Sequence, residues 1–125
     1  MTVEGVFERF ISLSGLSEAQ AAQWSALVSE CTAAIRSRLR EDCDENANSA
    51  VLEGAAAAMA LWRRCAVMDA RDRVNSFKAG DVTISAKASA DSAYNVYLQA
   101  LAACGTLLSE EGFVFGRVES LCTEN

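Results

Sequence analysis

The fold is decided by residues 49–78, SAVLEGAAAAMALWRRCAVMDARDRVNSFK. This stretch contains no proline, a single glycine and many alanine and unbranched residues, which are the strongest helix formers. Its bulky apolar residues recur at steps of three and four, so they share one side of a helix. We therefore predict that this stretch is the central helix. The residues of its apolar side are Val51, Leu52, Met59, Trp62, Cys65 and Ala66.

Residues 55–58 are four consecutive alanines within this predicted helix. Small side chains let a second helix approach closely, so we expect the central helix to be packed on more than one side. The arginines of its far end lie off the apolar side and are expected to be solvated or paired. They are Arg63, Arg64, Arg71 and Arg73.

The totals predict one helical domain over residues 1–125. Hydrophobic residues make up 51% of the chain, but only 7% are aromatic, which favours close helix packing over a thick sheet core. No stretch approaches the ~20 apolar residues of a membrane helix. The first ten residues lack the basic and apolar regions of a secretory signal. We expect no membrane contact.

The net charge of −6 is unevenly distributed along the chain. Residues 1–35 carry four acids and one base, residues 36–87 eight acids and nine bases, and residues 88–125 five acids and one base. A protein that meets copies of itself can use such opposite patches to set their register. Solvated helix faces are the alternative interpretation. The overall acidity disfavours general nucleic-acid binding.

The chain has five cysteines and no histidine. The count is odd and no C-x-x-C pair occurs, so we expect reduced thiols in a cytosolic protein. Without histidine, a serine or cysteine nucleophile lacks its usual base, and the two lysines stand outside apolar runs. We expect no enzyme activity, no catalytic residue and no cofactor. A redox thiol is a weaker alternative, because no residue visibly activates one.

Three further helices are predicted around the central one. They cover residues 3–13, 18–41 and 89–110. Ser17 and Gln20 have the spacing of a capping box at the start of the second. Gly112 is expected to end the last.

Two short segments, residues 81–85 and 113–118, change to the two-residue period of a strand. They are predicted to pair as a ribbon, so the expected fold class is mainly α, a compact bundle of about four helices with a small two-stranded β element. Short strands with open edges pair readily with another chain. The alternating apolar residues are Val82 and Ile84 in the first segment, and Phe113 and Phe115 in the second.

The linker before the central helix carries a calcium-like spacing. Asp42, Asp44 and Asn46 occupy positions 1, 3 and 5 of a twelve-residue window that ends at Glu53, as in an EF-hand loop. Position 6 is Ala47, where the loop needs glycine for a sharp turn. The favoured interpretation is capping of a helix–helix turn, with no metal site. A calcium-binding helical module is the minor alternative.

Two short stretches stand out besides the alanine-rich helix. One is residues 77–84, FKAGDVTI, into which that helix leads, and the other is residues 112–115, GFVF. In these features the chain resembles the small head–tail connector, or head-completion, proteins of tailed bacteriophages and prophages. The resemblance implies a structural virion-assembly protein without catalysis or cofactor. It implies a ring of many copies between the portal and the tail, with DNA only passing through the lumen. It also implies a place in the virion, and in the bacterial cytoplasm during assembly.

Under this resemblance the partners are other copies of the chain, the portal protein and tail or stopper proteins. Residues 80–87 and 113–122 are expected to project as interaction segments. A cytoplasmic helical adaptor or regulator, binding a partner helix through residues 55–58, is the alternative. The predicted partner contacts are Asp81, Val82, Thr83, Ile84, Phe113, Phe115, Arg117, Arg71 and Arg73.

Overall fold

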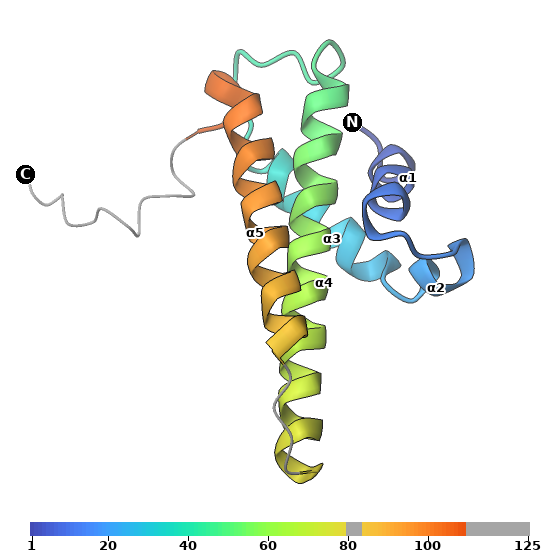
Figure 1. Ribbon diagram of the computed structural model, residues 1–125. Coiled ribbons are helices and arrows are strands. Elements are labelled where there is room, and N and C mark those ends of the chain that lie inside the picture. The colour runs from blue at the N-terminus through green and yellow to red at the C-terminus, as the bar shows by residue number, and fades with distance from the viewer. Residues whose placement is uncertain (80–83, 110–125) are drawn as a thin grey trace, which may run out of the picture.

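The computed structural model describes residues 1–79 and 84–109 (Figure 1). This part of the chain is mainly helical, as predicted, and its helices pack together. None of its helices is long and apolar enough to cross a membrane. The elements are α1 (Val3–Ser14), α2 (Glu18–Ala22), α3 (Ser25–Arg36), α4 (Ser49–Ala79), α5 (Ile84–Cys104) and the short 3-10 helix η1 (Gly105–Leu107).

The central helix predicted over residues 49–78 is confirmed as α4. The helices α1, α3 and α5 all pack against it, so it is covered on more than one side. Residues 55–58 are buried, with exposed fractions of 1% or less. Alanine side chains leave room for neighbouring helices to approach, and the larger core residues come mainly from those neighbours. These include Val6, Phe10, Val28, Ile35 and Leu101.

The first helices begin and end where their local signals place them. Thr2 caps α1, accepting the Gly5 N–H on its hydroxyl, and Gly15 ends α1 with a left-handed φ of 73°. The predicted capping box is confirmed. The Gln20 N–H donates to the Ser17 hydroxyl, and the Ser17 N–H donates to the Gln20 side chain.

The single helix predicted over residues 18–41 is wrong in two places. It is interrupted at Gln23 and Trp24, where a turn separates α2 from α3. It also ends early, at Arg36, because residues 38–40 pair with residues 107–109. The Arg40 N–H donates to the Leu107 carbonyl at 3.0 Å, and the Ser109 N–H donates to the Arg38 carbonyl at 2.7 Å. Long-range packing and pairing override helix propensity at both places.

The α4 and α5 helices form a long hairpin, and its far end extends beyond the other helices (Figure 1). The first predicted strand, residues 81–85, is wrong where the structure describes it, because Ile84 and Ser85 begin α5. Two alternating residues are a weak strand signal beside the alanine-rich sequence that follows them. The second predicted strand, residues 113–118, lies outside the described residues. Within the described part the only β-type pairing is the Leu39–Leu108 bridge.

The last helix ends earlier than predicted. Its expected end near Glu110, followed by Gly112, is wrong, because α5 stops at Cys104 and Gly105 adopts a left-handed φ of 55°. Both glycines are plausible stops in sequence. Gly105 ends the helix here because the residues after it turn to pair with residues 38–40.

Candidate functional site

The far end of the α4–α5 hairpin projects from the body formed by α1, α2 and α3 (Figure 1). We call this projection the arm and define it as residues 66–79 of α4 and 84–93 of α5. Among the described residues no third helix packs along this projection, and the face of α4 that is buried in the body is exposed here at Val67, Ala70 and Val74. The arm is therefore the first candidate for partner contact.

An apolar stripe runs along the α4 side of the arm. Val67, Ala70 and Val74 are spaced three, four and seven residues apart, so they lie on one helix face. Val67 is 39% exposed and Val74 is 55% exposed. Seven and eleven residues before Val67, on the same face of α4, Ala60 and Ala56 are fully buried. The face that is core in the body therefore continues, uncovered, along the arm. We call Val67, Ala70 and Val74 the arm stripe.

Two arginines stack on Trp24 where the arm meets the body. The guanidinium carbons of Arg64 and Arg71 lie 5.4 Å and 5.7 Å from the centre of the Trp24 ring. Each such cation–π contact contributes about 0.5–1 kcal/mol when exposed. Arg71 also donates to the sulfur of Met68 at 3.9 Å. The turn between α2 and α3, which the sequence pattern missed, serves to bring Trp24 against α4.

Aromatic rings join α4 to α5 at the base of the arm. The Trp62 and Tyr97 rings are stacked with their centres 5.2 Å apart, and the Tyr94 ring lies 4.9 Å from Trp62. Tyr97 is buried, and this burial raises the pKa of its hydroxyl. Such ring pairs contribute about 0.5–1.5 kcal/mol beyond burial of their area. They hold the two helices of the hairpin in a fixed register.

A groove of about 580 Å³ lies among α1, α4 and α5. Small residues of α4, Gly54 and Ala58, contribute to its lining, which is more apolar than polar. Leu13 of α1 and Val96 of α5 are 45% and 38% exposed there, more than core residues are. Its lining is Gly5, Glu8, Arg9, Ser12, Leu13, Val51, Glu53, Gly54, Ala58, Val96, Ala100 and Ala103.

Sequence reasoning did not find this groove. The available signal was the pair of small residues Gly54 and Ala58, one helical turn apart, but periodicity does not say which small face stays open. The adaptor alternative placed a partner helix on residues 55–58. The structure uses that surface for the chain's own packing, because all four residues are buried. Of these four, only Ala58 lines the groove.

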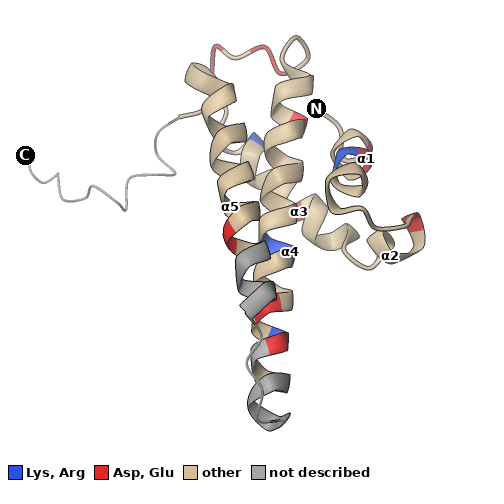
Figure 2. Cartoon of the chain, viewed as in Figure 1, with Lys and Arg blue, Asp and Glu red and all other residues tan. Residues whose placement is uncertain are grey.

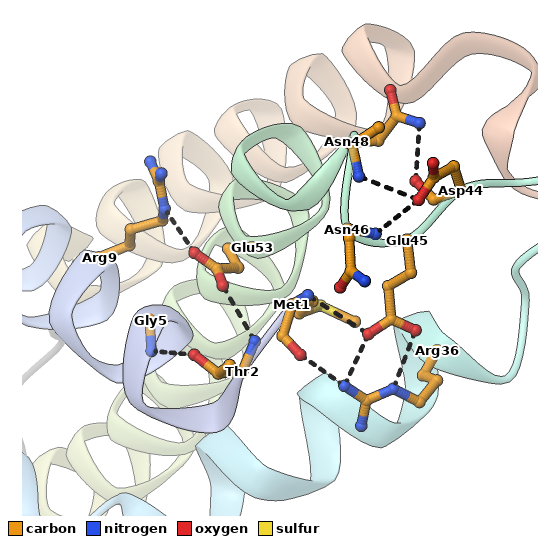
Figure 3. A network of polar contacts seen from close by, with 11 residues as sticks. Met1, Thr2, Gly5, Arg9, Arg36, Asp44, Glu45, Asn46, Asn48 and Glu53 are labelled. Atoms are coloured by element: carbon orange, nitrogen blue, oxygen red, sulfur yellow. Dashed lines mark hydrogen bonds and ion pairs between the residues drawn. The ribbon is translucent and has the colours of Figure 1, made fainter.

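Glu53 joins α4 to α1 beside the groove (Figure 3). Its carboxylate accepts the Thr2 N–H at 2.9 Å and the Arg9 Nε–H at 3.4 Å. Gly5 makes this approach feasible, because a Cβ at that position would lie 2.5 Å from both carboxylate oxygens. The ion pair and the glycine fix where α1 crosses α4.

A second ion-pair network holds the start of the chain. Glu45 accepts two hydrogen bonds from Arg36, at 3.3 Å and 3.0 Å, and lies 3.3 Å from the amino group of Met1 (Figure 3). Arg36 also donates to the Met1 carbonyl at 2.7 Å. The hydrogen bond from Arg36 lowers the pKa of Glu45. The Met1 side chain is buried in the core.

The residues with calcium-like spacing have separate partners. Asp44 accepts the N–H groups of Asn46 and Ala47 on Oδ1, both at 3.1 Å, and Asn48 donates to the Asp44 carbonyl (Figure 3). Glu53, the proposed closing ligand, binds Thr2 and Arg9. Asp42 lies in the turn before them. Among the described residues, no group of three or more acidic, cysteine or histidine residues is placed to hold a metal.

The structure describes few of the predicted partner contacts. Arg71 lies on the arm and is exposed, Arg73 lies within α4, and Ile84 is the first residue of α5. The others lie outside the described residues, and they are Asp81, Val82, Thr83, Phe113, Phe115 and Arg117.

Burial raises the pKa of three of the four thiols that the structure describes. Cys31 is buried, and burial raises its pKa to about 11. Burial also raises the pKa of Cys65 and of Cys104. A raised pKa reduces the thiolate that nucleophilic and redox chemistry require. These three cysteines therefore act as apolar packing residues.

Comparisons of the chain with protein-family models, with curated proteins and with solved structures gave no match.

Proposed function

We propose that this chain is a structural assembly protein, a protomer of a phage-type head–tail connector ring. The observation that carries the proposal is the arm, a projecting helical hairpin whose stripe residues Val67 and Val74 are 39% and 55% exposed. Apolar side chains aligned on a projection are typical of surfaces that meet another protein. The proposal agrees with the resemblance to small connector proteins drawn from residues 77–84 and 112–115.

The contact surface in this proposal is helical and does not depend on the strand predicted over residues 81–85. Strand addition through residues 81–85 no longer contributes, because Ile84 and Ser85 are helical. Helix packing through the arm takes its place, and it needs no open strand edge. In this proposal the partners are other copies of the chain, the portal protein and tail or stopper proteins, and the protein acts in the virion.

Purified portal protein provides the test. The chain is mixed with portal rings, and the complexes are counted by electron microscopy and by co-sedimentation. We expect ring-shaped densities on the portal, and their loss in the double variant Val67→Asp, Val74→Asp. Leu98→Asp is the matched control, because Leu98 is 41% exposed but lies outside the arm stripe. The proposal is contradicted if the chain does not bind portal rings at any concentration.

A cytoplasmic helical adaptor is the second candidate, and the groove among α1, α4 and α5 favours it. A groove with exposed apolar walls and a floor of small residues accepts an amphipathic helix. In this case the chain does not bind portal rings, and Ala103→Trp, which fills the groove, abolishes binding of a cytoplasmic partner. Under the connector proposal, Ala103→Trp should instead lose assembly on portal rings.

A further inference from the structure

We propose that the arm of one copy of this chain docks its stripe into the groove of a second copy. The inference rests on the proposed assembly function and names the two surfaces that would meet. The donor surface is Val67, Ala70 and Val74. The acceptor surface is the groove among α1, α4 and α5.

The two surfaces lie on opposite sides of α4. Val67 follows Ala58 by nine residues, which is about two and a half helical turns, so the two side chains point in opposite directions. They are also separated by about 13 Å along the helix axis, at 1.5 Å per residue. One copy can therefore offer its arm to one neighbour while its groove receives the arm of another. A contact of this kind is head-to-tail and generates a ring where the rotation closes.

The shapes of the two surfaces are complementary. Gly54 and Ala58, with Ala100 and Ala103 of α5, leave the groove without large side chains at these positions. A helix that carries branched residues one and two turns apart packs its ridge into such a depression. Val67 and Val74 are two turns apart on the stripe and supply that ridge. Leu13 and Val96 contribute exposed apolar walls.

Charge favours the same pairing. The arm, residues 66–79 and 84–93, carries four bases and three acids, a net charge of +1, and Arg63 and Arg64 at its base add two positive charges. In the groove, Arg9 and Glu53 neutralise each other. None of the ion pairs formed by the described residues includes Glu8, which leaves one carboxylate at the groove. Acidic residues also lie on α1, α2 and the loop before α4 (Figure 2).

Arg71 is the arm residue placed to meet Glu8. It lies four residues after Val67 and three before Val74, so it borders the stripe. It is exposed, and among the described residues it contacts Trp24 and Met68, neither of which is an acid. Docking would therefore add a carboxylate partner to Arg71. Such pairs chiefly set orientation and association rate.

A complementation experiment tests the direction of the contact. Ala103→Trp fills the groove, and its control is Ala102→Trp, since Ala102 is also exposed but does not line the groove. Val67→Asp, Val74→Asp disables the arm, with Leu98→Asp as its control. Circular dichroism and urea midpoints confirm that each variant folds. Sedimentation velocity then measures the size of each variant and of their mixture.

We expect both site variants to lose self-association and both controls to keep it. Mixing the groove variant with the arm variant should give a one-to-one dimer and nothing larger, because only one pair of intact surfaces remains. A mixture that stays monomeric means that an intact arm and an intact groove do not bind each other, and it overturns the proposal. Assembly that persists in Ala103→Trp also overturns it, while leaving the connector proposal intact. A wild-type chain that neither self-associates nor binds portal rings overturns the connector proposal itself.

A charge exchange tests the pairing of residues. Glu8→Arg and Arg71→Glu should each weaken self-association, by about tenfold for a loss of 1.4 kcal/mol. The double variant should recover most of that loss. Glu4→Arg is the matched control, because Glu4 is exposed on α1 but does not line the groove. Equal effects of Glu4→Arg and Glu8→Arg, without recovery in the double variant, would mean that Glu8 and Arg71 do not meet.

Discussion

Glu53 and Gly5 decide how α1 is attached to α4. The carboxylate binds the N–H group of Thr2 at the start of α1 and Arg9 about two helical turns later, while the glycine leaves room for it. The sequence does not predict this contact, because a glutamate and a glycine on separate helices have no spacing that indicates they meet. Their effect is local and can be measured by substitution.

Gly5→Ala should destabilise the protein by about 1 kcal/mol. Alanine improves helix propensity by up to ~1 kcal/mol, but its Cβ displaces Glu53 from charged hydrogen bonds that contribute about 1.5–3 kcal/mol. Urea unfolding measures the net change in the free energy of unfolding from these two effects. In a Glu53→Ala background the clash is gone, so Gly5→Ala should become stabilising.

Gly54→Ala is the matched control for this pair, since no atom lies within 4 Å of its added Cβ. It should stabilise the protein by about 0.5–1 kcal/mol in either background. If Gly5→Ala stabilised the wild-type chain as much as Gly54→Ala does, Glu53 would not occupy the position described.

The Glu45–Arg36 pair makes stability depend on pH on the acid side. The pKa of Glu45 is lowered in the folded chain, so its contribution is present above the ordinary value near 4.3 and is lost as pH falls through the lower, folded value. Urea midpoints should therefore fall between about pH 5 and 3. Glu45→Gln should reduce that fall, and Glu41→Gln, exposed in the same loop, should not. If the urea midpoint fell equally with pH in both variants, the Glu45–Arg36 pair would be excluded as a cause of the fall.

Cys31 should resist alkylation in the folded protein. With a pKa of about 11, its thiolate fraction at pH 8 is about 10⁻³, against roughly a quarter for an ordinary thiol near 8.5. Mass spectrometry after brief iodoacetamide treatment should find Cys31 modified only in urea and, among the four cysteines that the structure describes, half-buried Cys43 modified first. Because the folded pKa is raised, stability should also decrease as pH rises from about 8.5 toward 11. Rapid labelling of Cys31 in the folded chain would show that it is accessible.

At the scale of the element, α4 was the most predictable part of the molecule. Its length, its centre and its cover on several sides follow from alanine content and three–four periodicity. The break at Trp24 and the end of α3 at Arg36 were not predictable, because they depend on an arginine pair on α4 and on hydrogen bonds to residues 107–109. Periodicity carries no information on contacts so distant in sequence.

At the start of α5, the sequence pattern predicts a strand where the structure has a helix. An alternation of four residues predicted a strand, yet Ile84 and Ser85 are helical. A short alternating run fits a helix terminus as well as a strand, and alanines on its C-terminal side favour the helix. The candidate surfaces were partly predictable. The sequence predicts a partner contact at Arg71, whereas the groove arises only from the spacing of three helices.

Enlarging an alanine of α4 should distinguish its covered and uncovered parts. Ala56→Leu places a large side chain where α4 is fully buried, so it should destabilise the protein by about 1–3 kcal/mol. Ala66→Leu, at an exposed position of the same helix, should change stability by less than about 0.5 kcal/mol. Thermal or urea unfolding compares them. Equal effects would mean that α4 is not the covered centre of the bundle.

At the scale of the whole molecule, the protein consists of a body and an arm. The body buries α4 on several sides and ties its helices with two ion-pair networks (Figure 3). The arm continues α4 and α5 without such cover and exposes the stripe that would otherwise be core. In the proposed assembly, another protein would cover this stripe.

Sedimentation velocity of the wild-type chain over a wide concentration range tests that claim most directly. The account predicts species larger than one chain that grow with concentration, disappear in the double variant Val67→Asp, Val74→Asp and persist in Leu98→Asp. A single species of 13.3 kDa at every concentration, with and without portal rings, would contradict it.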